Sequence, residues 1–554
     1  MTTTITRMVA WSACVVCLLG VSAASAADYY IDDANGADAH DGTTETTAWK
    51  TLARIGQAPL QPGDRVLLKR GGLWKEALPV PASGARDKPI TYAAYGAGNQ
   101  PQIVAEKYAV DIARKSGITL QDLDIIGNGY AVFIHARQGE YSGFIFRNCR
   151  ITCLGAHGLS GHCIHQASEP IITERNGRRV ADEGPAVFKN LVVVGCILTP
   201  GRQGWSNGIN LHNNVTDFTI ENNVIGPAGE DAILLWNCKS GIVASNTCGG
   251  NGENSIDIKN SSDLMVSHNS CTNDNYGGIL LHEIMFLEEH KPNDLNQRVV
   301  IEHNTITGAG QCFRSIRSAP EITAGIWMNN SDDCIVRYNR LVDCLGSGIQ
   351  IDDAESSQNN NQVYGNVIVN AGQFDWCAGI DLADCVGTRV FNNLIYNQQA
   401  GAGISLRGGK NAQGIQVLNN IVTTAPFTPD ARPSVGPPLL VRLRPEAGRD
   451  LVCDYNCYGP DRDDGLGGSL PGKVTLARGR LRDWQDAFQL DLHSFAADPK
   501  LKSPASGDFT LTLGSPCVGK ATRIGGYARD AAGTAIPQGP APDIGPYEMP
   551  AIAQ

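Results

Sequence analysis

The chain has 554 residues, 42% of them hydrophobic and 18% charged, and a formal net charge of −11 at pH 7. This acidic balance disfavours a nucleic-acid partner, because nucleic-acid binding selects for basic patches. It also implies weak repulsion from acidic polysaccharides, unless a binding site is locally cationic or holds a metal.

The N-terminus has the pattern of an export signal. Arg7 precedes an apolar run from Met8 to Val21, and Ala24-Ser25-Ala26 supplies the small-x-small sequence that a signal peptidase cuts. The run is shorter than the ~20 apolar residues of a membrane-spanning helix. We therefore predict a signal peptide over 1–26 and no membrane span. The mature protein is expected to be secreted, periplasmic or extracellular, and monomeric, with disulfides possible but not assignable.

An asparagine followed two residues later by an apolar residue recurs through the middle of the chain. Its copies are Asn148, Asn223, Asn246, Asn269, Asn304, Asn339, Asn366, Asn393 and Asn420. From Asn223 onward the steps lie between 23 and 35 residues, and the shortest suits a coil of strands and turns better than two packed helices. Because Asn tolerates a left-handed corner and its amide can stack on the next one, we interpret this column as architecture.

Each repeat also contains an apolar-x-apolar triplet, from Ile209-Asn210-Leu211 to Ile404-Ser405-Leu406. Alternation with a period of two predicts a strand. In stacked parallel coils the apolar columns fill the interior and the intervening residues face outward. Cys248 and Cys271 fall in a different apolar column, the one two residues after the recurring asparagine, so we expect them to be buried.

Motifs at the two ends of the chain extend this interpretation. Tyr29-Tyr30-Ile31-Asp32 with Ala48-Trp49-Lys50-Thr51-Leu52, and Asp543-Ile544-Gly545 with Tyr547-Glu548, resemble the first and last segments of secreted right-handed parallel β-helix proteins of the pectate-lyase-like superfamily. The resemblance implies an all-β, single-stranded, right-handed parallel β-helix. We expect an N-terminal cap and first coils over 27–105, the regular solenoid over 106–460, and a Pro/Gly-rich C-terminal segment over 461–554 that packs back on it. Many unrelated reactions use this scaffold.

Alignment of the triplets predicts which residues share an outer face. Trp236, Lys259 and His282 occupy equivalent places on consecutive coils, with His212 and Asp257 beside them. Each residue alone is more often part of a solvated face, but together they favour a polysaccharide site. Insertions over 166–185, 283–298 and 311–324 are expected to form walls around it. Expected substrate-binding residues are Trp236, His212, Trp327, Arg314 and Arg317, although both arginines also fit an ordinary surface.

The segment Gly252-Glu253-Asn254-Ser255-Ile256-Asp257-Ile258-Lys259 resembles the calcium loop of family 9 pectate lyases. The resemblance implies Ca²⁺ bound by Glu253, Asn254, Asp257 and, one coil earlier, Asp231, which is a set of oxygen ligands that suits a hard cation. Acids that merely finish exposed turns are the alternative. The lysine of that family falls at Leu280, which cannot act as a base, so Lys259 or His282 would have to take that role.

Three functions follow from these residues. The first is a Ca²⁺-assisted polysaccharide lyase that cleaves a uronate-containing glycan by β-elimination. The second is a glycoside hydrolase with two carboxylates drawn from Asp257, Asp352, Asp353, Asp381 and Asp384. The third is a non-catalytic carbohydrate-binding protein.

Overall fold

The computed structural model describes residues 26–155, 161–168, 171–175, 178–182, 186–282, 295–314, 323–352, 358–426, 437–444, 446–460, 463–470 and 472–550. The expected signal peptide lies outside these ranges except for Ala26. Within them, no helix is long and apolar enough to cross a membrane.

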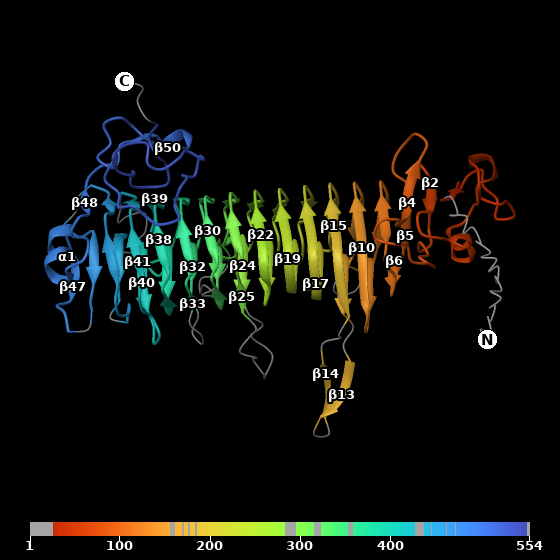
Figure 1. The fold of residues 1–554 in the computed structure, drawn as a ribbon, viewed down its shortest axis with the longest axis horizontal. Helices are drawn as coiled ribbons and strands as arrows, with labels where there is room; N and C mark the ends of the chain where they lie inside the picture. The colour runs from red at the N-terminus through yellow and green to blue at the C-terminus, as the bar shows by residue number, and fades with distance from the viewer. Residues whose placement is uncertain are drawn as a thin grey trace, which may run out of the picture.

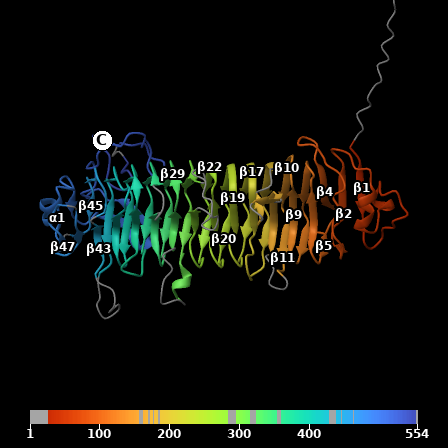
Figure 2. The same ribbon diagram turned by 90° about the horizontal axis from the view of Figure 1, so that it is seen from below.

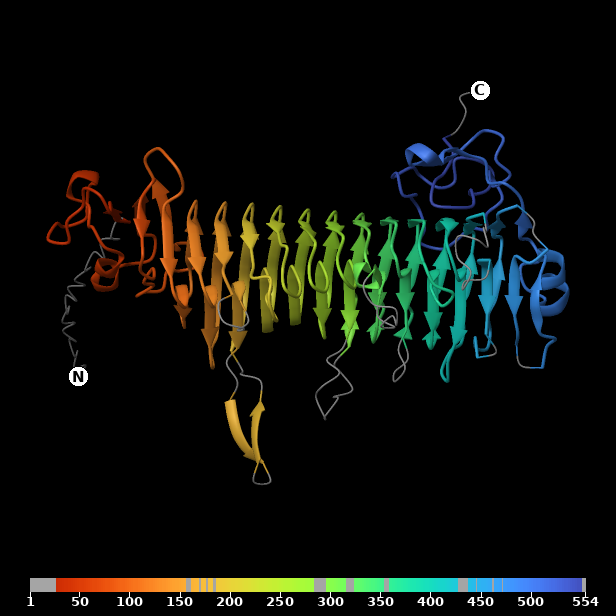
Figure 3. The same cartoon turned by 180° about the vertical axis from the view of Figure 1, so that it is seen from behind.

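The chain winds into one elongated solenoid of parallel strands (Figure 1; Figure 3 gives the view from behind). Each strand pairs with the strand one coil later, as β17 (Ile209–Glu221) does with β19 (Ile233–Ala244). The interior is apolar, because Ile209, Ile233 and Leu235 are all fully buried. The predicted parallel β-helix is confirmed.

Three faces surround this interior. The first face consists of β6 (Tyr108–Ala113), β9 (Tyr130–Ala136), β12 (His162–Ser168), the first halves of β17 and β19, β21 (Ile256–Lys259), β24 (Ile279–His282), β28 (Ala324–Met328), β32 (Ser347–Ile351), β36 (Ala378–Ala383), β40 (Ala402–Gly408) and β43 (Leu439–Leu443). The second face consists of β1 (Asp28–Ile31), β2 (Arg65–Lys69), β4 (Ile90–Tyr95), β7 (Ile118–Gln121), β10 (Glu140–Arg147), β15 (Val187–Val194), the second halves of β17 and β19, β22 (Ser262–Ser267), β26 (Val300–Glu302), β30 (Ile335–Arg337), β34 (Gln362–Tyr364), β38 (Arg389–Phe391), β41 (Gln416–Leu418) and β44 (Val452–Asp454). The third face consists of β3 (Leu73–Trp74), β5 (Gln102–Ala105), β8 (Asp124–Gly127), β11 (Arg150–Cys153), β16 (Ile197–Thr199), β18 (Val224–Ile225), β20 (Thr247–Gly249), β23 (Ser270–Thr272), β27 (Thr305–Thr307), β31 (Arg340–Val342), β35 (Val367–Val369), β39 (Leu394–Gln398), β42 (Ile421–Thr424), β45 (Cys457–Tyr458) and β48 (Phe495–Ala496).

The predicted asparagine ladder is present from Asn223 to Asn420 and continues one coil further, to Asn456. Each side-chain amide donates to the next across Nδ2–Oδ1 distances of 2.9 to 3.1 Å. Each side-chain amide also bonds to the backbone. Asn304, for example, donates to the Val266 carbonyl oxygen and accepts from the Asn269 N–H. The ladder thus satisfies buried backbone groups at one corner of the solenoid.

The expectation that the ladder asparagines adopt the left-handed conformation is wrong. The residue before each of them does so instead, for example Asn222 with φ 57° and Ser245 with φ 56°. Asn148 has φ 52°, so it occupies this preceding position and is not a member of the ladder. Cys196 fills the ladder place one coil before Asn223, and its N–H donates to the Asn223 Oδ1 at 2.9 Å.

The cysteines that the structure describes are all buried, and none of these forms a disulfide. Cys248 and Cys271 pair in register on β20 and β23, as expected for an apolar column. Burial raises the pKa of both thiols. These cysteines are core residues with little thiolate character.

The two ends of the solenoid are covered differently. At the N-terminal end β1 already pairs with β2, beside the short 3-10 helices η1 (Glu45–Thr47) and η2 (Leu52–Gln57). At the C-terminal end coils continue to β48, past the expected boundary at 460, and helix α1 (Leu481–Phe488) buries Trp484 against the core. The chain then folds back, as Figures 1 and 2 show, and Phe509 and Ile544 pack on Ile421 of the third face.

Of the expected insertions, the first contains an antiparallel hairpin of β13 (Ile171–Arg175) and β14 (Arg178–Asp182) that projects from the solenoid (Figure 1). Most of the second lies outside the described residues. The third is described only at its ends, including the 3-10 helix η4 (Gln311–Arg314). The remaining elements are β25 (Asn296–Gln297), β29 (Ser331–Asp332), β33 (Gln358–Asn359), β37 (Cys385–Val386), β46 (Leu466–Gly468), β47 (Leu476–Gly479), β49 (Leu501–Ser503), β50 (Asp508–Leu511) and η6 (Pro504–Ser506).

Candidate functional site

The strand register brings the expected residues of the first face together. Trp236, Lys259 and His282 are direct partners on β19, β21 and β24, as the repeat predicts. In the neighbouring column Asp257 follows Leu234 and precedes Leu280. Parallel coils lie roughly 4.8 Å apart, so side chains 23 residues apart in sequence are in contact distance.

Asp257 is the centre of this group. Its Oδ2 lies 3.1 Å from Lys259 Nζ and its Oδ1 lies 2.9 Å from His282 Nε2, while its own side chain is 2% exposed. Burial alone would raise the pKa of Asp257, but His282 and Lys259 outweigh it and lower the pKa to about 2. The carboxylate is therefore ionised at neutral pH.

The same ion pair determines the state of Lys259. Burial lowers its pKa, but the carboxylates of Asp257 and Asp231 outweigh burial and raise the pKa above the usual range. Lys259 is thus an ammonium ion at neutral pH, which does not suit a general base. His282 remains the better placed base, since its side chain is 22% exposed and its Nδ1 has no hydrogen-bond partner among the described residues.

A cluster of three carboxylates precedes β19 and β21. Oxygens of Glu230, Asp231 and Glu253 all lie within 4.8 Å of one another. Asp231 is fully buried, and its Oδ2 has no hydrogen-bond partner among the residues that the structure describes. Burial, reinforced by the neighbouring acids, raises the pKa of Asp231 and of Glu253. An unpartnered buried oxygen among acids is what a bound cation or a shared proton would satisfy.

The expected metal ligands divide into two groups. Asp231 and Glu253 belong to the carboxylate cluster, whereas Asn254 and Asp257 have other partners. Asn254 donates to Asp231 Oδ1 at 3.0 Å and accepts from the Gly277 N–H at 2.9 Å. Asn254 therefore fixes one oxygen of Asp231 and leaves the other available.

Glu230 was not among the expected ligands. It immediately precedes Asp231, and its carbonyl oxygen accepts from the Glu253 N–H on the next coil. The signal that could have identified it is this equivalence of Glu230 and Glu253 in consecutive repeats. Asn207 also holds it, donating to Oε2 at 3.0 Å.

The expected sugar-contacting aromatics behave differently from one another. His212 and Trp236 stack at 4.2 Å and remain half-buried. Trp327 is only 7% exposed and therefore presents little ring surface to a sugar. Its ring lies on His282 at 5.9 Å, and its indole N–H donates to Asp352 Oδ1 at 2.5 Å. The side chain of Arg314 and all of Arg317 lie outside the described residues.

The carboxylates considered for hydrolysis form a separate network. Arg407 Nη2 lies 2.6 Å from Asp352 Oδ2 and 2.9 Å from Asp381 Oδ2, and Gln350 also donates to Asp352. Asp384 accepts from the Asn411 N–H. These three acids therefore already have protein partners, while Asp353 lies outside the described residues.

A family model matches part of the chain, and several known proteins are similar to it. The family model "Right handed beta helix region" matches residues 292–422. The curated lacto-N-biosidase of Bifidobacterium longum is 40% identical over 76 residues, which is 13% of this chain and 5% of that protein. Similar solved structures include the GH136 lacto-N-biosidase from Eubacterium ramulus, with 16% identity, 80% and 67% coverage of the two chains, and a TM-score of 0.37. Pectate lyase Pel9A gives 12% identity, 95% and 97% coverage, and a TM-score of 0.34.

These similarities are low in identity, and the match to the curated relative spans one twentieth of its length. The family description adds the right-handed sense to the parallel coils that the strand pairing establishes. The chain is therefore a right-handed parallel β-helix protein, which is the fold that its resemblance to the pectate-lyase-like superfamily predicted.

Proposed function

We propose that the protein is a carbohydrate-active enzyme that cleaves a uronate-containing polysaccharide by β-elimination. The observation that carries this proposal is the Asp257–His282 pair on adjacent coils, next to a carboxylate cluster with an unpartnered buried oxygen on Asp231. The short segment shared with a lacto-N-biosidase supports a carbohydrate substrate.

In this proposal His282 Nδ1 removes the proton α to the uronate carboxylate. The electron pair of that C–H bond forms the C4=C5 double bond as the C4–O bond breaks, and the departing oxygen takes a proton from solvent. Asp257, 2.9 Å from Nε2, stabilises the imidazolium that forms. Lys259 stays protonated and balances the charge of Asp257.

Glu230, Asp231 and Glu253 fit a Ca²⁺ ion, because their oxygens converge and Asp231 Oδ2 lacks a partner within the described ranges. Bound there, the ion would supply positive charge for the carboxylate of the substrate. From the neighbouring coils, Asn207 would hold Glu230 in place and Asn254 would hold Asp231.

A glycoside hydrolase is the second candidate, favoured by one specific observation. Glu253 and Asp257 lie in one segment, yet the pKa of Glu253 is raised by burial and the pKa of Asp257 is lowered. Two carboxyl groups with opposite shifts are the usual signature of a general acid beside an ionised carboxylate. Asp257 is 2% exposed, however, which makes it a poor nucleophile for a bulky glycan.

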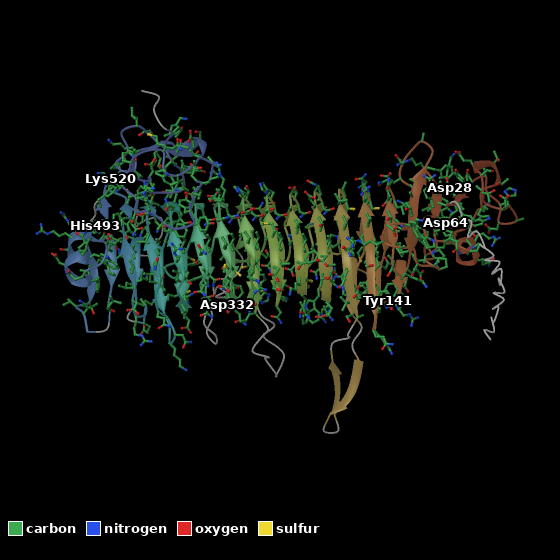
Figure 4. The ribbon with its side chains drawn as sticks, in the orientation of Figure 1. Asp28, Asp64, Tyr141, Asp332, His493 and Lys520 are labelled. Carbon is green, nitrogen blue, oxygen red and sulfur yellow. The ribbon has the colours of Figure 1, made fainter. Side chains whose placement is uncertain are left out.

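The discriminating experiment is a panel of uronate-containing polysaccharides assayed for both ultraviolet-absorbing unsaturated ends and reducing ends, with calcium and with chelator. We expect unsaturated ends, and their loss in His282→Ala and with chelator. His493→Ala is the matched control, because His493 also pairs with an aspartate, Asp454, at 2.6 Å but lies at the C-terminal end (Figure 4). Reducing ends without unsaturation would establish hydrolysis, and binding without turnover would establish a binding protein.

A further inference from the structure

We propose that the outer side of β6, β9 and β12, together with the starts of β17 and β19, binds uncharged sugar residues of the same glycan. The substrate would then be a heteropolysaccharide in which neutral sugars flank the uronate, rather than a homopolymer of uronates. This inference rests on the proposed function for the presence of a uronate in the glycan. The neutral-sugar surface itself is argued from separate observations.

Three columns of the first face connect this surface to the site. The column of Asp257 contains Phe133, His165, Asn210 and Leu234 in direct register. The column of Lys259 and His282 contains His135, Ala167, His212 and Trp236. The third contains Tyr108, Tyr130 and His162. From the Tyr130 coil to the Asp257 coil there are four steps, or roughly 19 Å.

Rings cover this surface almost continuously, and we call it the ring platform (Tyr108, Tyr130, Phe133, His135, His162, His165, His212 and Trp236). Tyr130 stacks on Tyr108 at 5.6 Å and contacts His165 at 4.5 Å. Phe133 stacks on His165 at 5.4 Å, and the platform ends at the His212–Trp236 stack beside Lys259. Tyr108, Tyr130 and Phe133 keep partly exposed rings, which suit the apolar faces of sugars.

The buried histidines of the ring platform carry no charge. Burial lowers the pKa of His162 to about 3 and that of His212 to about 4, and it lowers the pKa of His165 as well. These histidines are therefore uncharged at neutral pH. At the margins of the described platform, Asp111 pairs with His135 and Lys107 lies over Tyr108. Uncharged rings and imidazoles offer a uronate carboxylate no cationic partner, so they suit a neutral sugar.

Unpartnered polar atoms point to a ligand with hydroxyl groups. His165 Nδ1, Asn210 Oδ1 and Trp236 Nε1 are buried and have no hydrogen-bond partner in the described part of the chain. His165 and Asn210 are only 8% and 7% exposed, so their unpartnered atoms lie within the platform and not on freely moving surface side chains. A sugar hydroxyl both donates and accepts, and it could therefore satisfy all three types of atom.

The test measures binding with the full chain carrying His282→Ala, which prevents turnover. Probes are two homouronans, polygalacturonate and alginate, and four heteropolysaccharides, xanthan, gellan, glucuronoxylan and rhamnogalacturonan. We expect at least one heteropolysaccharide to bind about tenfold more tightly than either homouronan. Added Phe133→Leu or Tyr130→Leu should weaken that binding about tenfold, because each removes a ring but keeps apolar volume.

Tyr141→Leu is the matched control and should leave binding unchanged, because Tyr141 is a half-buried ring on β10 of the second face (Figure 4). Thermal unfolding of all three variants checks that they fold. Equal binding of homouronans and heteropolysaccharides, or unchanged binding in both platform variants, overturns the inference. If the platform variants lose binding while the wild type yields saturated products, the sugar-binding role of the ring platform is supported and β-elimination is refuted. If homouronans yield unsaturated products at rates that Phe133→Leu leaves unchanged, β-elimination is supported and the sugar-binding role of the ring platform is refuted.

Discussion

Replacing Asp257 with asparagine should destabilise the protein by an amount that can be derived from its surroundings. The lowering of the Asp257 pKa from 3.8 to about 2 corresponds to about 2 kcal/mol of native-state stabilisation at neutral pH. The side chain is 2% exposed, so solvent screening reduces this value little. Lys259, 17% exposed, would also lose its carboxylate partner, which adds to the loss.

The pH dependence has a definite sign. A carboxyl group with a lowered pKa contributes stability that is present above its unfolded pKa and is lost as the pH falls through its folded pKa. The deficit of Asp257→Asn should therefore be complete at pH 7 and fall to about half at pH 3. Urea unfolding followed by circular dichroism at both pH values measures it.

A double-mutant cycle separates the ion pair from other effects. Lys259→Met removes the cation but keeps most of the apolar stem, so Asp257→Asn should cost less in the Lys259→Met background than in the wild type. The explanation fails if Asp257→Asn is as stable as the wild type at pH 7, or if its cost is the same in both backgrounds.

Two further predictions concern the architecture. Asn304→Ala removes two side-chain bonds to Asn339 and Val266 and two from Asn269, so unfolding should become easier by about 4 kcal/mol, whereas Asn411→Ala at an exposed position should change little. Urea titration compares them, and equal stabilities would contradict a supporting role of the ladder. Burial raises the pKa of Asp274 to about 7, so the stability it contributes is complete below pH 4 and lost as the pH rises through 7. Wild-type stability should therefore fall by up to about 4 kcal/mol between pH 4 and pH 8. Asp274→Asn should abolish this fall and the exposed control Asp217→Asn should retain it, and an unchanged pH profile in Asp274→Asn would count against the explanation.

The fold and the register could be predicted from the sequence because both depend on local periodicity. Alternation with a period of two decides which residues enter the core, and the recurring asparagine marks one corner of each coil. These two signals were enough to place Trp236, Lys259 and His282 side by side. The error at Asn148 has a local cause, since Asn suits the left-handed position as well as the ladder position.

The state of the site residues could not be predicted in this way. Whether Lys259 is a base or an ion-pair partner depends on its 3.1 Å distance from Asp257 and on how deeply both are buried. The sequence offered Asn254 as a ligand, but the structure commits its amide to Asp231 and Gly277.

By itself, then, the sequence determined the solenoid, its apolar columns and the neighbours along each face, because these repeat at a regular interval. Only the tertiary structure decided that Trp327 is buried, that Glu230 joins Asp231 and Glu253, and that histidine rings extend the face toward the N-terminus. The physical reason is that side-chain distance, burial and charge arise between coils, where the repeat specifies register but not which atoms meet.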